Sequence, residues 1–382
     1  MRIKIINKII VTIAIFTLIS APSIKIFYSS VIINLIPLFF LLFYYFTNIN
    51  NLFKRKSNKK AIFVYSISIV VFLLYFLFGR YSVIDADVLF RYTFLITVLF
   101  LLSSLVDFVN KKMLIGMIIS WAILISTLKL FEKLSYSSDL GQTYLTVGLP
   151  MGAGLTASLI LLFFSKKKFF SYEKILILIC SGIILTGLLF SRGRSNLLYP
   201  LFVFVFTVGG AILYNKSFRL KYLFFISLIL FFAVSFITSN AYNSDFTSLN
   251  RLSASSVDIS EEDRLMKWTK SFDYILDYPF FGYGVDSSYY LIGNYPHNIF
   301  IELALSFGIP VFILFFIFIM KYLIAYIRQF SIEKMSLEML CIGAIGMYFF
   351  VSWNTSFDLG TSYIPLSLIL LFKIYSYEYR KK

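Results

Sequence analysis

Residues 260–310 read SEEDRLMKWTKSFDYILDYPFFGYGVDSSYYLIGNYPHNIFIELALSFGIP. This stretch begins with charged residues and ends in an apolar run, and it contains His297, the single histidine of the chain. Arg264, Lys267 and Lys270 precede the histidine. Because most of the surrounding sequence is apolar, we expect the polar chemistry of the protein to be concentrated in this stretch.

The composition of the whole chain is that of a membrane protein. Hydrophobic residues make up 59% of the 382 residues, charged residues make up 14%, and the mean hydropathy is +0.84. Soluble domains are roughly half apolar and about a quarter charged. A chain of this length has room for about a dozen spans of roughly 20 residues. The sequence therefore predicts an all-α, polytopic membrane protein with about 12 transmembrane helices and one large loop.

Apolar runs long enough to cross a bilayer divide the chain into three parts. Residues 1–238 are expected to hold nine spans, 239–296 a large extracytoplasmic loop with short helices, and 297–382 three further spans. The runs lie at 5–24, 26–46, 61–79, 88–106, 113–130, 143–164, 173–190, 196–214, 220–238, 298–320, 338–356 and 361–377. The first run begins among three basic residues, Arg2, Lys4 and Lys8, and we interpret it as a retained helix rather than a cleaved signal peptide.

The basic residues predict the orientation of these spans. The net charge is +16, and basic residues beside apolar spans are more typical of topology and lipid contact than of nucleic-acid binding. With both termini in the cytoplasm, 24 of the 35 lysines and arginines fall on the inner side. The other eleven are Lys25, Arg80, Arg91, Lys129, Lys133, Arg192, Arg194, Arg251, Arg264, Lys267 and Lys270. Topology does not require these eleven residues on the outer side, so they need another explanation.

Two of these arginines, Arg192 and Arg194, lie in the short connection FSRGRSN at residues 190–196. An arginine near a span costs free energy unless its side chain reaches the interface or a partner. Two interpretations remain open at this point. The pair either binds an anionic ligand or extends toward the phosphates of outer-leaflet lipids.

The large loop contains a predicted helix and a turn. Ser260 and the acidic residues after it are typical of a helix start, because a hydroxyl and carboxylates satisfy the free amide donors there. An apolar face that could lie on the membrane is formed by Leu265, Trp268, Phe272 and Ile275 or Leu276. Pro279 is expected to end the helix. Gly282 and Gly284 are interpreted as turn glycines, since their spacing does not fit a phosphate-binding loop.

His297 is expected in the first turn of the next helix. A neutral imidazole can remove a proton from a hydroxyl group near pH 7. Asn298 and Glu302 follow it in place of further apolar residues. Two alternatives to the role of a base remain open for His297. It is either an ordinary residue at a helix terminus, or a residue that only orients an acceptor or binds phosphate. Both cysteines, Cys180 and Cys341, lie in apolar runs, so no zinc site is expected.

The order of these signals resembles the O-antigen ligase and polymerase superfamily of integral-membrane glycosyltransferases. The resemblance spans most of the chain, since the expected twelve-helix layout also agrees. It depends on four motifs: SRG at Ser191, Arg192 and Gly193; R-x-x-x-W at Arg264 and Trp268; P-x-x-G-x-G at Pro279, Gly282 and Gly284; and HN followed by a glycine at His297, Asn298 and Gly308.

The resemblance implies a GT-C-like fold and a substrate class. Family members use undecaprenyl-diphosphate-linked glycans on the outer side of the bacterial inner membrane, and they transfer them to another repeat unit or to the lipid A core. The implied reaction is metal-independent, needs no cofactor and inverts the anomeric carbon. Ligases of the family usually carry Gly, Thr or Tyr three residues after the glycine of the last motif. This chain has Val311 at that position, which favours a polymerase of O-antigen or capsular polysaccharide. A chain-length regulator is a further candidate partner.

The resemblance also implies roles for individual residues. Arg192 and Arg264, with Arg194 as a weaker third, would bind the diphosphate, and His297 would be the general base. Asn298, Glu302 and Trp268 would support them, and the aromatic side chains of the loop that could stack on sugar rings are Trp268, Tyr283, Tyr289, Tyr290 and Tyr295. A lipid-linked sugar flippase, an O-acyltransferase and a structural membrane protein remain as alternatives. A flippase is disfavoured because the charges gather at one face and no internal repeat is evident.

Overall fold

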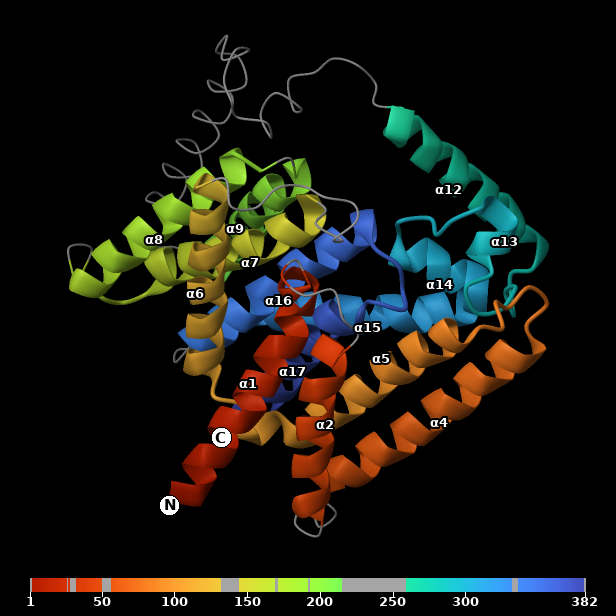
Figure 1. Ribbon diagram of the computed structural model, residues 1–382, viewed down its shortest axis with the longest axis horizontal. Coiled ribbons are helices and arrows are strands. Elements are labelled where there is room, and N and C mark those ends of the chain that lie inside the picture. The colour runs from red at the N-terminus through yellow and green to blue at the C-terminus, as the bar shows by residue number, and fades with distance from the viewer. Residues whose placement is uncertain are drawn as a thin grey trace.

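The computed structural model describes most of the chain as helices. The described residues are 2–25, 27, 32–49, 56–131, 144–168, 171–191, 193–214, 259–331 and 336–380. Within these ranges the secondary structure consists of helices and turns, without a β-strand. The predicted all-α class is therefore confirmed (Figure 1).

The helices fall into two groups along the chain. The N-terminal group comprises α1 (Arg2–Ile24), α2 (Ile32–Thr47), α4 (Lys56–Phe78), α5 (Ala86–Leu105), α6 (Lys111–Leu130), α7 (Tyr144–Phe164), α8 (Tyr172–Leu189) and α9 (Arg194–Tyr214). The C-terminal group comprises α12 (Ile259–Asp277), α13 (Ser288–Ile292), α14 (Ile299–Phe307), α15 (Ile309–Ile327), α16 (Leu337–Ser356) and α17 (Tyr363–Arg380). Short 3₁₀ turns follow α5 and α15.

The long apolar helices agree with the predicted spans. Nine helices in the described ranges are long and apolar enough to cross a membrane, and α2 and α17 contain shorter apolar helical segments. The chain is thus a multi-pass membrane protein. The run predicted at 220–238 lies outside the described residues.

One predicted span is wrong in its boundaries. The run at 298–320 is two helices, because α14 ends and α15 begins at Gly308. Gly308 has φ +84° and ψ 168°, a conformation that is accessible essentially to glycine alone. Pro310 then sits in the first turn of α15, where its missing N–H costs nothing, and it could not have continued α14. The apolar span is therefore α15 together with its 3₁₀ turn, residues Ile309–Phe330.

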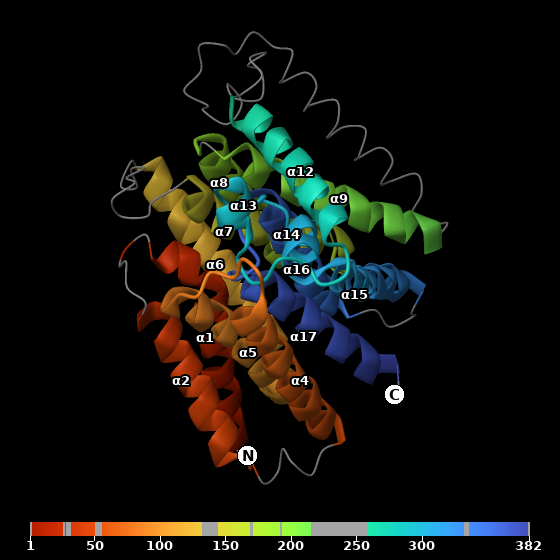
Figure 2. The same ribbon diagram turned by 90° about the vertical axis from the view of Figure 1, so that its right-hand side faces the viewer.

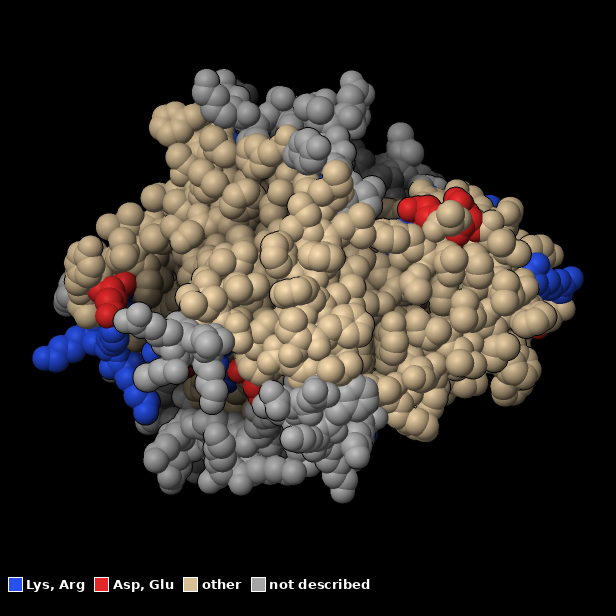
Figure 3. Space-filling view, turned by 60° about the horizontal axis from the view of Figure 1, so that its bottom comes forward, with Lys and Arg blue, Asp and Glu red and all other residues tan. Residues whose placement is uncertain are grey.

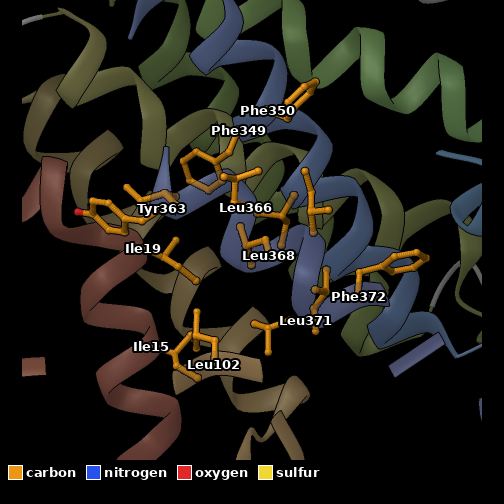
Figure 4. Close-up of a cluster of buried hydrophobic side chains, with 14 of the residues drawn as sticks. Ile15, Ile19, Leu102, Phe349, Phe350, Tyr363, Leu366, Leu368, Leu371 and Phe372 are labelled. Carbon is orange, nitrogen blue, oxygen red and sulfur yellow. The ribbon is translucent and has the colours of Figure 1, made fainter. Parts of the chain in front are cut away.

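The core of the bundle lies around α7 and α16. In the spans of these two helices, 83% and 78% of the residues are buried. Figure 4 shows Phe349 of α16 and Leu366 of α17 in this core, together with Ile15 of α1 and Leu102 of α5. Helices from both ends of the sequence therefore share one hydrophobic core.

The outer surface of the bundle is apolar. Phe63 and Phe78 of α4 are 66% and 79% exposed, and Leu314 of α15 is 68% exposed. In the face shown in Figure 3, most of the described surface is uncharged, and most lysines, arginines and acidic residues lie toward its edges. An exposed apolar surface of this extent is expected where side chains face lipid.

The polar connections gather at one end of the bundle, which we call the loop end and define by residues 78–86, 278–298 and 357–362. Two backbone hydrogen bonds join the first two segments, from Tyr81 N to Tyr283 O (2.8 Å) and from Val83 N to Val285 O (3.0 Å). Figures 1 and 2 show α12, α13 and α14 next to the turn between α4 and α5. The loop end therefore contains the segment that the sequence analysis singled out.

Candidate functional site

His297 lies between Pro296 and α14, just outside the helix. The prediction that it occupies the first helical turn is wrong, because α14 begins at Ile299 and Asn298 is its N-cap. The backbone of His297 has φ +54°. Among the described residues, only His297 and Asp286 combine a positive φ with a side chain. Such conformations are unfavourable for residues with a Cβ, and they persist where the surrounding contacts determine them.

The two polar residues after His297 make structural contacts. The side chain of Asn298 accepts hydrogen bonds from the backbone N–H groups of Phe300 (3.0 Å) and Ile301 (3.2 Å), which caps α14. Glu302 is 1% exposed, and its Oε2 accepts a hydrogen bond from Leu359 N at 2.9 Å. Two of the three expected supporting residues, Asn298 and Glu302, therefore hold the helix that follows His297.

Helix α12 is bound directly to the segment that carries His297. The indole N–H of Trp268 donates a hydrogen bond to the carbonyl oxygen of Pro296 at 2.7 Å. Arg264 precedes Trp268 by four residues, so both lie on one face of α12. Arg264 is half-buried. The structure thus places Arg264 on the side of α12 that contacts the His297 segment.

The predicted apolar face of α12 is divided between two surroundings. The predicted start near Ser260 and the end before Pro279 agree with the observed helix. Ile275 packs in a buried cluster with residues of α14, and Trp268 packs against that cluster. Leu265, Phe272 and Leu276 are 62%, 52% and 74% exposed. The prediction of one face on the membrane is therefore wrong for Trp268 and Ile275, because α14 covers them.

The turn after α12 packs against the end of α14. Ile309 N donates to the carbonyl oxygen of Pro279 at 2.7 Å, and Gly284 N donates to that of Ser306 at 3.0 Å. Gly284 has φ +109°, and a Cβ added there would lie 2.9 Å from the Cα of Gly79. The interpretation of Gly282 and Gly284 as turn glycines is consistent with this close packing.

The structure places the predicted arginine pair only in part. Arg192 lies outside the described residues, and Arg194 begins α9 with a side chain that is not described. The first turns of α9 contact α16: Tyr348 O–H donates to Asn196 Oδ1 (3.2 Å), and Tyr199 O–H donates to Thr355 Oγ1 (2.9 Å). Helix α16 ends at Ser356, and the turn that follows it contains Leu359, which donates a hydrogen bond to Glu302. The start of α9 therefore faces the loop end.

A second polar site at the loop end was not predicted. Arg91 of α5 forms ion pairs with Asp286 (Nη2 to Oδ2, 2.7 Å), Asp358 (Nη1 to Oδ2, 3.0 Å) and Asp87 (Nε to Oδ2, 2.9 Å). We call these four residues the ion cluster. Arg91 is one of the eleven basic residues that topology does not require on the outer side, and its ion pairs in the cluster explain its presence there. Only the i,i+4 spacing of Asp87 and Arg91 could be recognised in the sequence.

Burial affects the acidic groups around Arg91. Asp286 is 1% exposed and also accepts a hydrogen bond from the Tyr92 hydroxyl at 2.9 Å. Burial raises the pKa of Asp286, whereas Arg91 and Tyr92 favour its carboxylate form. Burial, followed by the charges of Asp358 and Asp286, raises the pKa of Glu302 well above its ordinary value. Arg91 therefore offsets part of the effect of burial on the pKa of Asp286.

The aromatic residues of the loop differ in their availability to a ligand. Tyr283 is 4% exposed and is enclosed by other rings, whereas Tyr289 and Tyr290 are 41% and 65% exposed. The ring of Tyr295 contacts that of His297, with 4.3 Å between their centroids. Tyr289, Tyr290 and Tyr295 therefore remain candidates for stacking on a sugar.

Among the described residues, no group of three or more His, Cys, Asp or Glu side chains is arranged to hold a metal ion.

Comparison with known proteins identifies the region that contains this site. The family model described as O-antigen ligase matches residues 175–316, and no curated protein matches the chain. The matched region contains all the predicted site residues, which are Arg192, Arg194, Arg264, Trp268, His297, Asn298 and Glu302, whereas Arg91 and Asp358 lie outside it. The predicted resemblance is confirmed over this region, since residues 175–316 are similar to the O-antigen ligase family.

Proposed function

We propose that the protein is a membrane glycosyltransferase of the extracytoplasmic side of the bacterial inner membrane. It transfers a glycan from undecaprenyl diphosphate to an acceptor hydroxyl group, and as a polymerase it joins repeat units into O-antigen or capsular polysaccharide. The observation that carries this proposal is the hydrogen bond from Trp268 to Pro296, because it holds the helix of Arg264 against the segment of His297.

The leaving group of the reaction is the lipid diphosphate. As the bond between the anomeric carbon and the phosphate oxygen breaks, negative charge grows on the diphosphate. Arginine matches phosphate oxygens with paired N–H donors and stays charged in any environment. We assign to Arg264 and Arg192 the role of binding the diphosphate on which this charge grows, with Arg194 as a third ligand. Cations held in place before the reaction stabilise such charge most effectively in a site that excludes water.

The acceptor hydroxyl group is activated by His297. The imidazole takes the hydroxyl proton while the oxygen attacks the anomeric carbon from the face opposite the diphosphate, so the configuration inverts. Two observations support this role: Asn298, directly after His297, caps α14, and the ring of Tyr295 contacts the imidazole. No step of this reaction requires a metal ion or a cofactor.

An apolar groove among the spans supports a lipid-linked donor. A cavity of about 430 Å³ lies between α4, α5, α15 and α17, and Tyr65, Phe100 and Phe315 are among the residues that line it. Its volume is in the range of ligand pockets. Phe300, three residues after His297, packs edge-on against Phe315 with 5.6 Å between the ring centroids. The groove is thus connected by packed rings to the helix of the proposed base, and it suits an isoprenoid chain.

The second candidate function is that of a ligase, which would transfer the lipid-linked glycan to the lipid A core. The description of the matching family model favours it. Val311, which departs from the usual ligase residue, favours the polymerase.

Analysis of the glycans in a strain without this protein tests both assignments. Loss of a polymerase leaves single repeat units attached to the core, whereas loss of a ligase leaves long chains on the carrier lipid. Complementation with the unchanged chain should restore long chains, and complementation with the His297→Ala variant at equal protein level should not. A strain with unchanged glycans and unchanged lipid-linked intermediates would contradict both functions.

A further inference from the structure

We propose that Arg91 is a positioning residue that fixes the segment bearing His297 through two separate connections. The first connection runs through Asp286, and the second runs through Asp358 and Glu302. This inference rests on the proposed function, because it assumes that the position of His297 limits the transfer step. It assigns a role to a part of the chain outside the region that matches the family model.

The first connection fixes the start of the segment. Arg91 Nη2 lies 2.7 Å from Asp286 Oδ2, and the Tyr92 hydroxyl holds the other carboxylate oxygen at 2.9 Å. Asp286 and His297 are eleven residues apart and have φ values of +53° and +54°. A backbone held in this region on two residues with side chains requires surrounding contacts that determine it. At Asp286, the ion pair and the hydrogen bond are those contacts.

The second connection fixes the helix after His297. Arg91 Nη1 lies 3.0 Å from Asp358 Oδ2, and Asp358 Oδ1 accepts a hydrogen bond from Thr361 N at 2.8 Å, which closes the turn after α16. In the same turn, Leu359 N donates to Oε2 of the buried Glu302 side chain. Glu302 lies five residues after His297. The turn therefore links Arg91 to α14 on the C-terminal side of His297.

The shape of the guanidinium group explains why an arginine is required. Its separate N–H groups reach two carboxylates on different segments, whereas a lysine offers one compact charge. Arg91 is 20% exposed and Asp286 is 1% exposed, so this pair is shielded from water. Removing the arginine would leave buried carboxylates without a counter-charge, which is strongly unfavourable. Both connections to the His297 segment therefore depend on one side chain.

The experiment compares Arg91→Lys and Asp358→Asn with the unchanged full chain in proteoliposomes. The donor is an undecaprenyl-diphosphate oligosaccharide, and kcat, the KM for donor and the fraction of folded protein are measured. We expect kcat per folded molecule to fall roughly 10- to 100-fold, because small displacements of a catalytic group have effects of this size. The KM for donor should stay within about twofold, because the residues assigned to the diphosphate are unchanged.

Arg80→Gln is the matched control. Arg80 is an exposed arginine of the α4–α5 turn, and it contacts the rings of Tyr81 and Tyr278 and donates a hydrogen bond to the Tyr278 hydroxyl rather than to a carboxylate. Its substitution should leave kcat within about twofold. A role of Arg91 in folding alone would lower the amount of folded protein and leave kcat per folded molecule unchanged, and that result would overturn the inference.

Hydrogen exchange measures how firmly the backbone of the His297 segment is held, and it does not depend on activity. Peptides covering residues 286–298 should exchange faster in Arg91→Lys than in the unchanged chain, while peptides of α16 should exchange at the same rate. Equal exchange of residues 286–298 in both proteins would contradict the inference. The outcomes also separate the two proposals: if His297→Ala keeps full activity, the proposed function fails, whereas an inactive His297→Ala with a normal Arg91→Lys rejects only the role of Arg91.

Discussion

His297 and Arg91 lie at the same end of the bundle, but their surroundings differ. His297 is half-buried in a loop beside the ring of Tyr295. Arg91 starts from a membrane helix and is surrounded by three carboxylates. Two of the three carboxylates around Arg91 come from segments that are 195 and 267 residues away in the sequence, whereas Tyr295 precedes His297 by two residues. The comparison fits the two proposed roles. The side chain of His297 is left accessible to substrate, whereas Arg91 and its carboxylates hold the backbone in place.

After His297 and Arg91, the largest effect is expected from Arg264. The contacts proposed between Arg264 and the diphosphate are hydrogen bonds to a charged ligand, each of which contributes about 1.5–3 kcal/mol, and Arg264→Ala removes them. We expect the KM for donor to rise roughly 10- to 100-fold, with little change in thermal stability because Arg264 is only half-buried. Kinetics with the purified protein provide the measurement. Lys270→Ala, a substitution of an exposed lysine on the same helix, is the control and should change the KM by less than about twofold.

The groove should respond to the length of the donor lipid. Ser68→Trp places an indole in the groove, and we expect the KM for a long-chain donor to rise roughly 4- to 15-fold, because each excluded methylene group loses about 0.8 kcal/mol. A donor with a short lipid should be unaffected. Leu74→Trp, on the same helix but not among the groove residues, serves as the control. Equal effects of Ser68→Trp on both donors would contradict the assignment of the groove.

A smaller effect is expected where α12 meets the His297 segment. Trp268→Phe keeps an aromatic ring but removes the N–H that donates to Pro296. A hydrogen bond of this kind contributes about 0.5–1.5 kcal/mol, so kcat should fall roughly 2- to 10-fold. Steady-state kinetics at saturating donor give the result. An unchanged kcat would show that this contact does not align the two proposed functional residues.

The smallest effect concerns the pH dependence of stability. Because the pKa of Glu302 is raised in the folded protein, its contribution to stability is complete below its unfolded pKa of about 4.5 and is lost as the pH rises through the folded-state pKa. Glu302→Gln keeps an acceptor for Leu359 N but cannot ionise. From about pH 4.5 upwards, the Tm of the unchanged protein should therefore decrease relative to that of Glu302→Gln. Parallel Tm curves for the two proteins would contradict this expectation.

Much of the fold could be predicted from local sequence. Each described span coincides with an apolar run, and α12 begins near Ser260 and ends before Pro279, as its capping residues and proline indicate. The break at Gly308 was missed because an uninterrupted apolar run on both sides fits one long helix equally well. The glycine conformation that separates α14 from α15 depends on packing against the turn at Pro279.

The candidate site could be predicted less completely. His297 stood out as the single histidine, and Arg264 and Trp268 through their spacing. The ion cluster could not be found in the same way, because Arg91 is 195 residues from Asp286 and 267 residues from Asp358. Local periodicity carries no information about such pairs. Asn298 and Glu302 were assigned to the right segment, but their observed contacts are a helix cap and a hydrogen bond to the turn after α16.

The central claim is that one imidazole activates the acceptor while arginines bind the diphosphate. Its most direct test measures donor binding and glycan transfer separately for His297→Ala in proteoliposomes. We expect the Kd for donor to stay within about threefold and the transfer rate to fall roughly 10²- to 10⁴-fold, as for the loss of a general base. Transfer at the rate of the unchanged protein, or a loss explained entirely by weaker donor binding, would contradict the claim.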